Sequence, residues 1–208
     1  MRMNPLASIK GVWIAGLLVS VVLAMIVNLA GGNGLLAFDE LAFVRWVHIV
    51  AGIIWVGLLY YFNFVQMPAV AAATADQGGP GPAAIGKYIL PRALLWFRWA
   101  SLVTWGAGAW YLVQNDSLLD VFTLGLTGGD PDYALPMGIG VWLGTVLLIN
   151  VWFVLWPNQK KLMGLAPSQG EADLAKAKKT VASVARINAV LSIPMLMFMV
   201  AAPHGIPL

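Results

Sequence analysis

The chain has 208 residues, of which 60% are hydrophobic and only 10% are charged. This composition excludes an ordinary water-soluble domain and predicts one integral membrane domain over residues 1–208. The absence of cysteine excludes disulfides, iron–sulfur clusters and a c-type haem attached through C-x-x-C-H. The formal charge of +3 does not indicate nucleic-acid binding, because the cations are confined to certain loops. We therefore expect membrane lipid, and no nucleic acid, around this protein.

Five apolar segments are long enough to cross a bilayer as helices. Each helical residue adds ~1.5 Å, and the hydrocarbon core is ~30 Å thick. The predicted helices cover approximately residues 11–30, 43–65, 93–113, 136–156 and 181–202. The first is longer than the hydrophobic region of a signal peptide, so we expect it to be retained. The sequence predicts an all-α, polytopic membrane bundle of five transmembrane helices.

The segments between these helices carry breakers and charges. Pro68 is expected to end the second helix, since proline cannot continue the hydrogen-bond ladder. Residues 69–91, 114–135 and 157–180 are predicted to be loops, the last with a short surface helix. Pro194 predicts a kink in the fifth helix.

Two features of the last two helices indicate packing. Gly140 and Gly144 form a G-x-x-x-G step, which permits close approach of a neighbouring helix. Met195, Met197 and Met199 alternate and form no single stripe, so we interpret them as packing residues and not as ligands.

Charge is distributed unevenly between the two predicted membrane faces. Arg45 is the one cation on the second face, which also receives six of the nine acidic residues. The other 11 of the 12 Lys and Arg residues lie on the N-terminal side: Arg2, Lys10, Lys87, Arg92, Arg98, Lys160, Lys161, Lys176, Lys178, Lys179 and Arg186. By the positive-inside rule, the N-terminus is cytoplasmic and the C-terminus periplasmic in a bacterial inner membrane.

The second predicted helix contains an arginine and a histidine near its beginning. Ionisable groups inside a bilayer are costly, so a function is the default hypothesis for Arg45 and His48. His48, Gly52 and Trp55 share one helical stripe. Gly52 would leave room for a flat group beside the imidazole, and Arg45 would hold a haem propionate nearer the water. A ring hydrogen-bonded between helices, or placed at the membrane interface, is the alternative for His48.

The other histidine, His204, follows the fifth predicted helix. That helix ends on the face where the second helix begins, so helix count places both histidines of the chain at the periplasmic face. We predict that His48 and His204 together ligate one haem b, with Arg45, Gly52 and Trp55 around it. If His204 does not reach the iron, His48 is left with another axial partner, such as a methionine, or with none.

Several motifs resemble one known family. Arg45–Ile49 with Gly52, Trp55 and Gly57 is similar to the histidine helix of membrane-bound urate hydroxylases, the urate oxidase N-terminal family. Further similar pieces are Gly78-Gly79 with Lys87-Tyr88 and Pro91, Trp96–Trp99, Asn150–Phe153, Pro157–Lys161 and, more loosely, Asn188 through Pro194 to His204. The resemblance implies an integral membrane module fused to a C-terminal c-type cytochrome that takes electrons from urate oxidation.

The chain departs from this family pattern at three histidine positions. Leu95, Ile187 and Gln77 stand where the family would have histidine, and the cytochrome extension is absent. Leu95 and Ile187 both belong to the cytoplasmic half, so we expect one metal or haem site to be lost there and its space to be filled by apolar packing.

Four functions follow from these observations. The first is a membrane-embedded b-type haem protein that exchanges electrons with a periplasmic cytochrome c or a larger redox complex. The second is a cofactor-free accessory subunit that stabilises a respiratory or photosynthetic complex. The third is copper or zinc bound at the two histidines with help from methionine or carboxylate. An enzyme that oxidises urate is the fourth.

Overall fold

The computed structural model describes residues 5–32, 34 and 38–206. Helix makes up 83% of the structure, and the described residues contain no strand, so the all-α prediction is confirmed. Contacts divide the chain into two compact units, Met1–Phe43 and Val44–Leu208. Arg2, which the charge analysis assigns to the cytoplasmic face, lies outside the described residues.

The first unit contains a short 3-10 turn, η1 (Pro5–Ala7), and the helix α1 (Ile9–Ala30). Ser8 caps α1, because its hydroxyl accepts a hydrogen bond from the backbone N–H of Gly11 at 3.0 Å. No residue of α1 is buried within the structure, although the helix is strongly apolar. A helix that is apolar all round needs lipid or protein around it.

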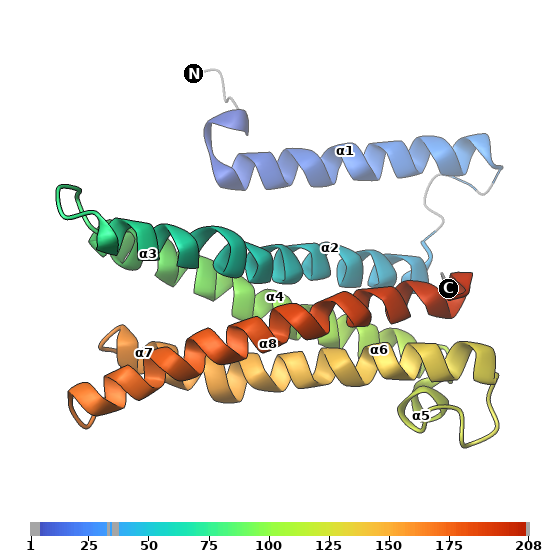
Figure 1. The fold of residues 1–208 in the computed structure, drawn as a ribbon. Helices are drawn as coiled ribbons and strands as arrows, with labels where there is room; N and C mark the ends of the chain where they lie inside the picture. Colours follow the sequence, from blue (N-terminus) through green and yellow to red (C-terminus); the bar gives the residue numbers. More distant parts are fainter. Residues whose placement is uncertain (1–4, 33, 35–37, 207–208) are drawn as a thin grey trace. The chain divides into compact units, whose positions relative to one another are not determined.

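The second unit contains four long helical rods (Figure 1). The first runs through α2 (Glu40–Tyr60), the π-helix η2 (Tyr61–Gln66) and α3 (Met67–Ala75), with α2 beginning in the first unit. The second is η3 (Ile85–Ile89) with α4 (Leu90–Gln114), and the short α5 (Leu118–Phe122) follows it. The third is α6 (Pro131–Ile149), η4 (Asn150–Leu155) and α7 (Trp156–Leu162), and the fourth is α8 (Glu171–His204).

Four helical stretches of the described chain are long and apolar enough to cross a membrane: Ile9–Ala30, Glu40–Ala75, Pro131–Leu162 and Glu171–His204. These stretches indicate a membrane protein. The remaining long helix, α4, which the sequence predicts as the third of five spans, is not among the four, although it has 25 residues. Arg92, Arg98 and several tryptophans lower the mean hydropathy of this helix.

Three prolines explain the three π-helices. Pro68, Pro91 and Pro157 each lie two residues beyond the end of η2, η3 and η4, respectively. In an α-helix the proline ring clashes with the carbonyl four residues earlier. That carbonyl belongs in each case to a residue inside the π turn, where the wider backbone relieves the clash. The chain thereby passes a proline without breaking the helix.

Several predicted boundaries are wrong, and the relief at Pro68 and Pro157 explains two of them. The second helix was expected to end near Pro68, but it continues to Ala75, and the fourth continues past Trp156 to Leu162. The fourth also begins earlier, at Pro131. The predicted surface helix in the 157–180 loop is the first part of α8, which runs unbroken from Glu171 through Pro194.

Helices α6 and α8 pack most closely, and the G-x-x-x-G step lies between them. A Cβ added at Gly140 would lie 3.1 Å from Met199 Cγ and 3.2 Å from its backbone nitrogen. A Cβ at Gly144 would lie 3.5 Å from Met195 Sδ. The glycines therefore admit methionine side chains of α8, which confirms the packing role predicted for Met195 and Met199.

A layer of buried polar side chains joins the rods at the level of the π turns. Asn150, the first residue of η4, donates from Nδ2 to Oδ1 of Asn188 at 2.8 Å, and Asn188 is fully buried. Asn188 donates in turn to the carbonyl of Leu147 at 3.4 Å. In η2, Asn63 donates to the carbonyls of Leu59 at 2.8 Å and Ala185 at 3.2 Å. Each of these two π turns thus presents an asparagine to α8.

The asparagine pair yields a first prediction. Asn188→Leu should destabilise the protein by roughly 1 kcal/mol, because it leaves the half-buried amide of Asn150 without its acceptor. The double variant Asn150→Leu/Asn188→Leu should recover most of this loss, since no partner is then orphaned. Reversible unfolding in mixed detergent micelles measures both effects. Strictly additive losses in the double variant would show that the pair is not coupled.

Candidate functional site

His48 lies on α2 and is held by the backbone of α4. Its Nδ1 lies 2.7 Å from the carbonyl oxygen of Thr104. A carbonyl only accepts, so Nδ1 carries the proton and donates. Nε2 makes no hydrogen bond to a described residue and is left as the unprotonated nitrogen. Metal-ligating histidines are commonly oriented in this way, with one ring nitrogen on a backbone carbonyl and the other free for the metal.

Glycine on the facing helix makes room for the imidazole. A Cβ added at Gly108 would lie 2.8 Å from Nδ1 and 2.9 Å from Cε1 of His48. Gly52, which was expected to open a space on α2, instead faces α4: a Cβ there would meet Cγ2 of Thr104 at 3.6 Å. The gap between α2 and α4 is therefore occupied by His48 and Thr104 themselves.

Arg45 lies one turn before His48 and also contacts α4. Its Nη2 donates to the hydroxyl of Tyr111 at 2.6 Å, and its guanidinium carbon lies 4.9 Å from the centre of the Tyr111 ring. Arg45 is exposed. The structure thus joins α2 to α4 at two successive levels, first through Arg45 and Tyr111 and then through His48 and Thr104.

Trp55 belongs to the hydrophobic core and is only 2% exposed. Its indole Nε1 has no hydrogen-bond partner among the described residues. The core around it includes Leu59, Phe97 and Leu147. Trp55 shares the stripe of His48 and Gly52, as predicted, but it lies deeper in the bundle.

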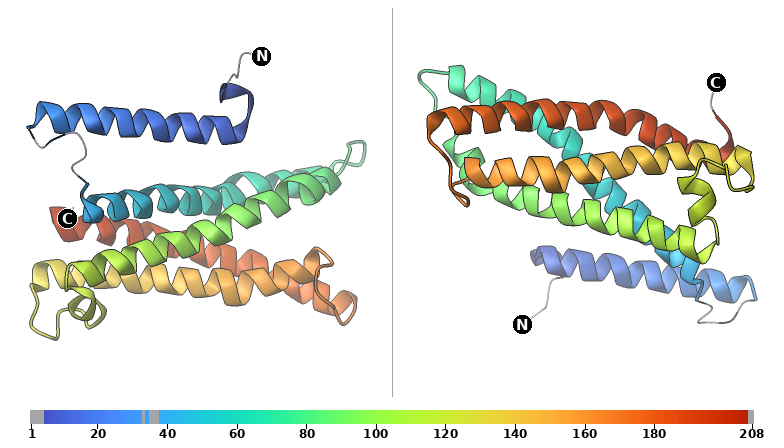
Figure 2. Two further views of the ribbon diagram at one scale, coloured as in Figure 1. Left: turned by 180° about the vertical axis from the view of Figure 1, so that it is seen from behind. Right: turned by 90° about the horizontal axis from the view of Figure 1, so that it is seen from below.

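His204 is the last residue of α8 and is exposed. The end of α8 and the beginning of α2 lie at the same end of the second unit (Figure 1). In the view from below these two helix ends lie apart (Figure 2, right). The helix ends nearest the two histidines therefore lie at one end of the unit, and no described contact joins His48 to His204. Among the described residues, no group of three His, Asp or Glu side chains could hold a metal ion.

The three residues that replace the family's histidines, Leu95, Ile187 and Gln77, are not packed inside the bundle. Leu95 and Ile187 are each 49% exposed and lie on the outer surface of the bundle. The expected apolar filling around them is wrong. Gln77 lies in the exposed turn after α3.

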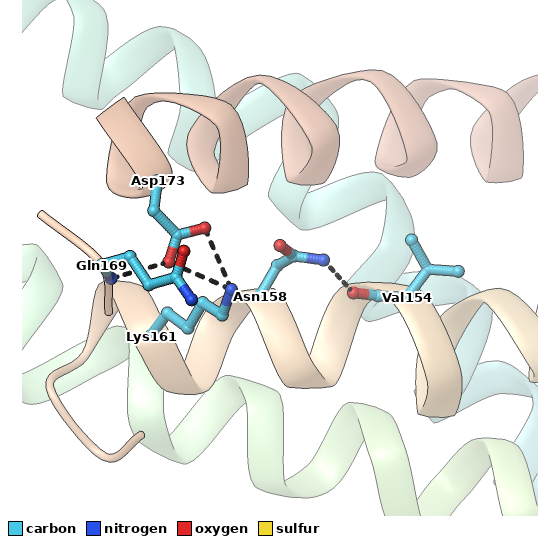
Figure 3. A network of polar contacts seen from close by, with 5 residues as sticks. All are labelled: Val154, Asn158, Lys161, Gln169 and Asp173. Atoms are coloured by element: carbon cyan, nitrogen blue, oxygen red, sulfur yellow. Dashed lines mark hydrogen bonds and ion pairs between the residues drawn. The ribbon is translucent and has the colours of Figure 1, made fainter. Parts of the chain in front are cut away.

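The Pro157–Lys161 motif has local structural partners (Figure 3). Lys161 Nζ lies 3.0 and 3.1 Å from the two carboxylate oxygens of Asp173, and the backbone N–H of Gln169 donates to the same carboxylate at 3.2 Å. Asn158 donates to the carbonyl of Val154 at 2.8 Å. This partly exposed ion pair ties the end of α7 to the beginning of α8.

Arg98, on α4, is half-buried and packs against tryptophans where η4 passes into α7. Its guanidinium carbon lies 3.4 Å from the ring centre of Trp156 and 5.7 Å from that of Trp152. Aromatic faces attract a cation in this arrangement. Trp152 and Trp156 thus both contact the guanidinium of Arg98.

Sequence reasoning missed the partners supplied by α4. Thr104 acts through its backbone, for which no side-chain pattern exists, and Tyr111 lies 66 residues from Arg45. Gly106 and Gly108 were visible in the sequence as small residues within a predicted span, which is a signal for close helix contact. Only the structure shows which of the two faces His48.

These two glycines form a matched pair for a second prediction. Gly108→Ala should destabilise the protein by roughly 1–3 kcal/mol, because the new methyl group overlaps the imidazole of His48. Gly106 has nothing within 4 Å of an added Cβ. Gly106→Ala should therefore stabilise α4 by roughly 0.5–1 kcal/mol through helix propensity. Thermal unfolding in detergent compares them, and equal midpoints would contradict the packing described at His48.

Comparison with known proteins identifies no relative of this chain. No family model, no curated protein and no solved structure matches the chain. The resemblance to membrane-bound urate hydroxylases accordingly stays a prediction from short motifs, and the chemistry of the site is argued from its own residues.

Proposed function

We propose that this protein is a membrane-embedded electron-transfer protein that carries a b-type haem on His48. The observation that carries the proposal is the hydrogen bond from His48 Nδ1 to the Thr104 carbonyl, which leaves Nε2 as the ligand nitrogen. A bound haem supplies a one-electron carrier whose potential depends on its axial ligands and their hydrogen bonds. The Thr104 carbonyl orients the imidazole and makes Nε2 a stronger donor to iron.

The residues around His48 fit a haem on one side only. Gly108 and Thr104 occupy the α4 side of the ring, so a porphyrin would lie on the Nε2 side. Arg45 is engaged by Tyr111 but is exposed, so it can still hold a propionate at the water end. His204 stays the proposed second ligand, which requires the last turn of α8 to reach across the end of the bundle.

The orientation of the chain is part of this proposal. We place α4 in the membrane as a fifth span, because it runs beside three helical rods of similar length (Figure 1). The end of the second unit formed by α3, η3 and α7 carries Lys87, Lys160 and Lys161, whereas the other end carries acidic loop residues. This asymmetry supports a cytoplasmic N-terminus and a periplasmic C-terminus in a bacterial inner membrane. Electrons would then pass to or from a periplasmic cytochrome c or a larger membrane complex.

A cofactor-free accessory subunit is the second candidate. It is favoured by the close packing at Gly52 and Gly108, where α2 and α4 meet without space for a flat group. In that function the His48–Thr104 hydrogen bond serves only to join two helices.

A third prediction separates these candidates. The purified protein in detergent, dithionite-reduced minus oxidised, should show a Soret band and a sharp α-band, with about one haem per chain. His48→Ala should lose both bands, and His204→Ala should shift or weaken them. Full haem content in the His48→Ala protein would refute ligation by His48. A featureless spectrum of the wild-type protein would favour the accessory subunit.

A fourth prediction concerns orientation. Reporter fusions after Gln169 should be cytoplasmic, and fusions after Asp120 should be periplasmic. If α4 does not cross the membrane and the N-terminus stays cytoplasmic, both reports would be reversed, with Asp120 cytoplasmic and Gln169 periplasmic, because the span through α6 still separates the two positions. That result would also remove His48 and His204 from a common face.

A further inference from the structure

The second unit contains a partly open cavity of about 70 Å³ at the level of the π turns, away from His48. Its walls come from α2, η2, α3, α4, η4, α7 and α8. Most of the lining is apolar, and the residues that matter here are Phe62, Leu94, Phe97, Leu155, Gln66 and Gln159. The cavity is therefore an apolar space with two amide side chains.

Gln66 is the unusual member of this lining. It is the last residue of η2 and is only 8% exposed. Its Oε1 is buried and has no hydrogen-bond donor among the described residues. A buried amide oxygen without a partner is unfavourable, so a donor in the cavity would be stabilised there. Gln159 supplies a second, partly exposed amide on the same cavity.

The size and shape of the cavity restrict what this donor can belong to. At about 10–15 Å³ for each water, the space takes about five waters or a single six-membered ring. Phe62 and Phe97 meet edge to face at 5.4 Å between ring centres, and such aromatic edges and faces suit a third ring. A lipid acyl chain would fill the apolar space but would leave Gln66 unpaired.

We propose that this cavity binds the ring of an alkylated phenol or hydroquinone taken from the membrane, with a ring hydroxyl donating to Oε1 of Gln66. The apolar walls take the ring, and the alkyl chain leaves through the open side. The site lies at the end of the unit that carries the Lys87, Lys160 and Lys161 cations. It does not depend on a haem at His48.

A matched pair of probes tests the hydroxyl directly. 4-Hexylphenol and 4-hexylanisole differ only in that methylation removes the donor. Their binding to the full chain in lipid nanodiscs is measured by titration calorimetry, with empty nanodiscs subtracted for partitioning. The phenol should bind saturably and about tenfold more tightly than the anisole. Decylhydroquinone should compete with it for the same site.

Two glutamine variants provide the matched control. Gln66→Leu should lower phenol affinity to that of the anisole. This variant removes an unpaired buried amide and so should not unfold the protein. Gln114→Leu, the same change at an exposed position at the end of α4, should leave both affinities unchanged. Val181→Phe, which fills the cavity from α8, should abolish binding of both probes.

Three results would overturn the proposal. They are the absence of saturable phenol binding, equal affinity for the two probes, and phenol affinity that Gln66→Leu leaves unchanged. The first would mean that no phenol ring enters the cavity. Because the readout is calorimetric, a protein without haem can pass this test, and a haem protein can fail it.

Discussion

In the hydrocarbon of a membrane, every backbone N–H and C=O group must find its partner within the protein, and this constraint organises the second unit. Pro68, Pro91 and Pro157 would each break a helix, but a π turn before each one keeps the rod continuous. Two of these wide turns also present Asn63 and Asn150 to α8 and border the cavity that contains Gln66. The prolines thus determine where the polar groups and the free space of the bundle lie.

The contact between α2 and α4 follows from the same constraint, because a histidine in an apolar span needs a partner for its N–H. The Thr104 carbonyl provides it, and Gly108 provides the space for the ring. A single contact therefore serves both candidate functions: it joins two helices, and it leaves Nε2 as a ligand. What distinguishes them is whether a group binds on the Nε2 side.

The positions of the helices could be predicted from apolar length, and the G-x-x-x-G contact of Gly140 and Gly144 from small-residue spacing. Continuation through Pro68 and Pro157 could not, since proline normally ends a helix and a π turn has no sequence signature of its own. The stripe of His48, Gly52 and Trp55 was correct as helical geometry. The space expected beside Gly52 for a porphyrin is taken by Thr104 of α4. The sequence could not predict this, because residues on one helix do not show where a neighbouring helix approaches. The partner of Arg45 was missed for the same reason, since Tyr111 lies on that neighbour.

The tautomer of His48 tests the central claim most directly. His204→Asn leaves His48 as the sole histidine, so ¹⁵N-histidine labelling of this variant in bilayers gives signals from one imidazole only. The account predicts, for the haem-free protein, a protonated Nδ1 and an unprotonated Nε2, with the Nε2 signal changing when haem is added. A proton on Nε2 and none on Nδ1 would contradict it, because the Thr104 carbonyl could then not hold the ring and no free ligand nitrogen would remain on its outer side.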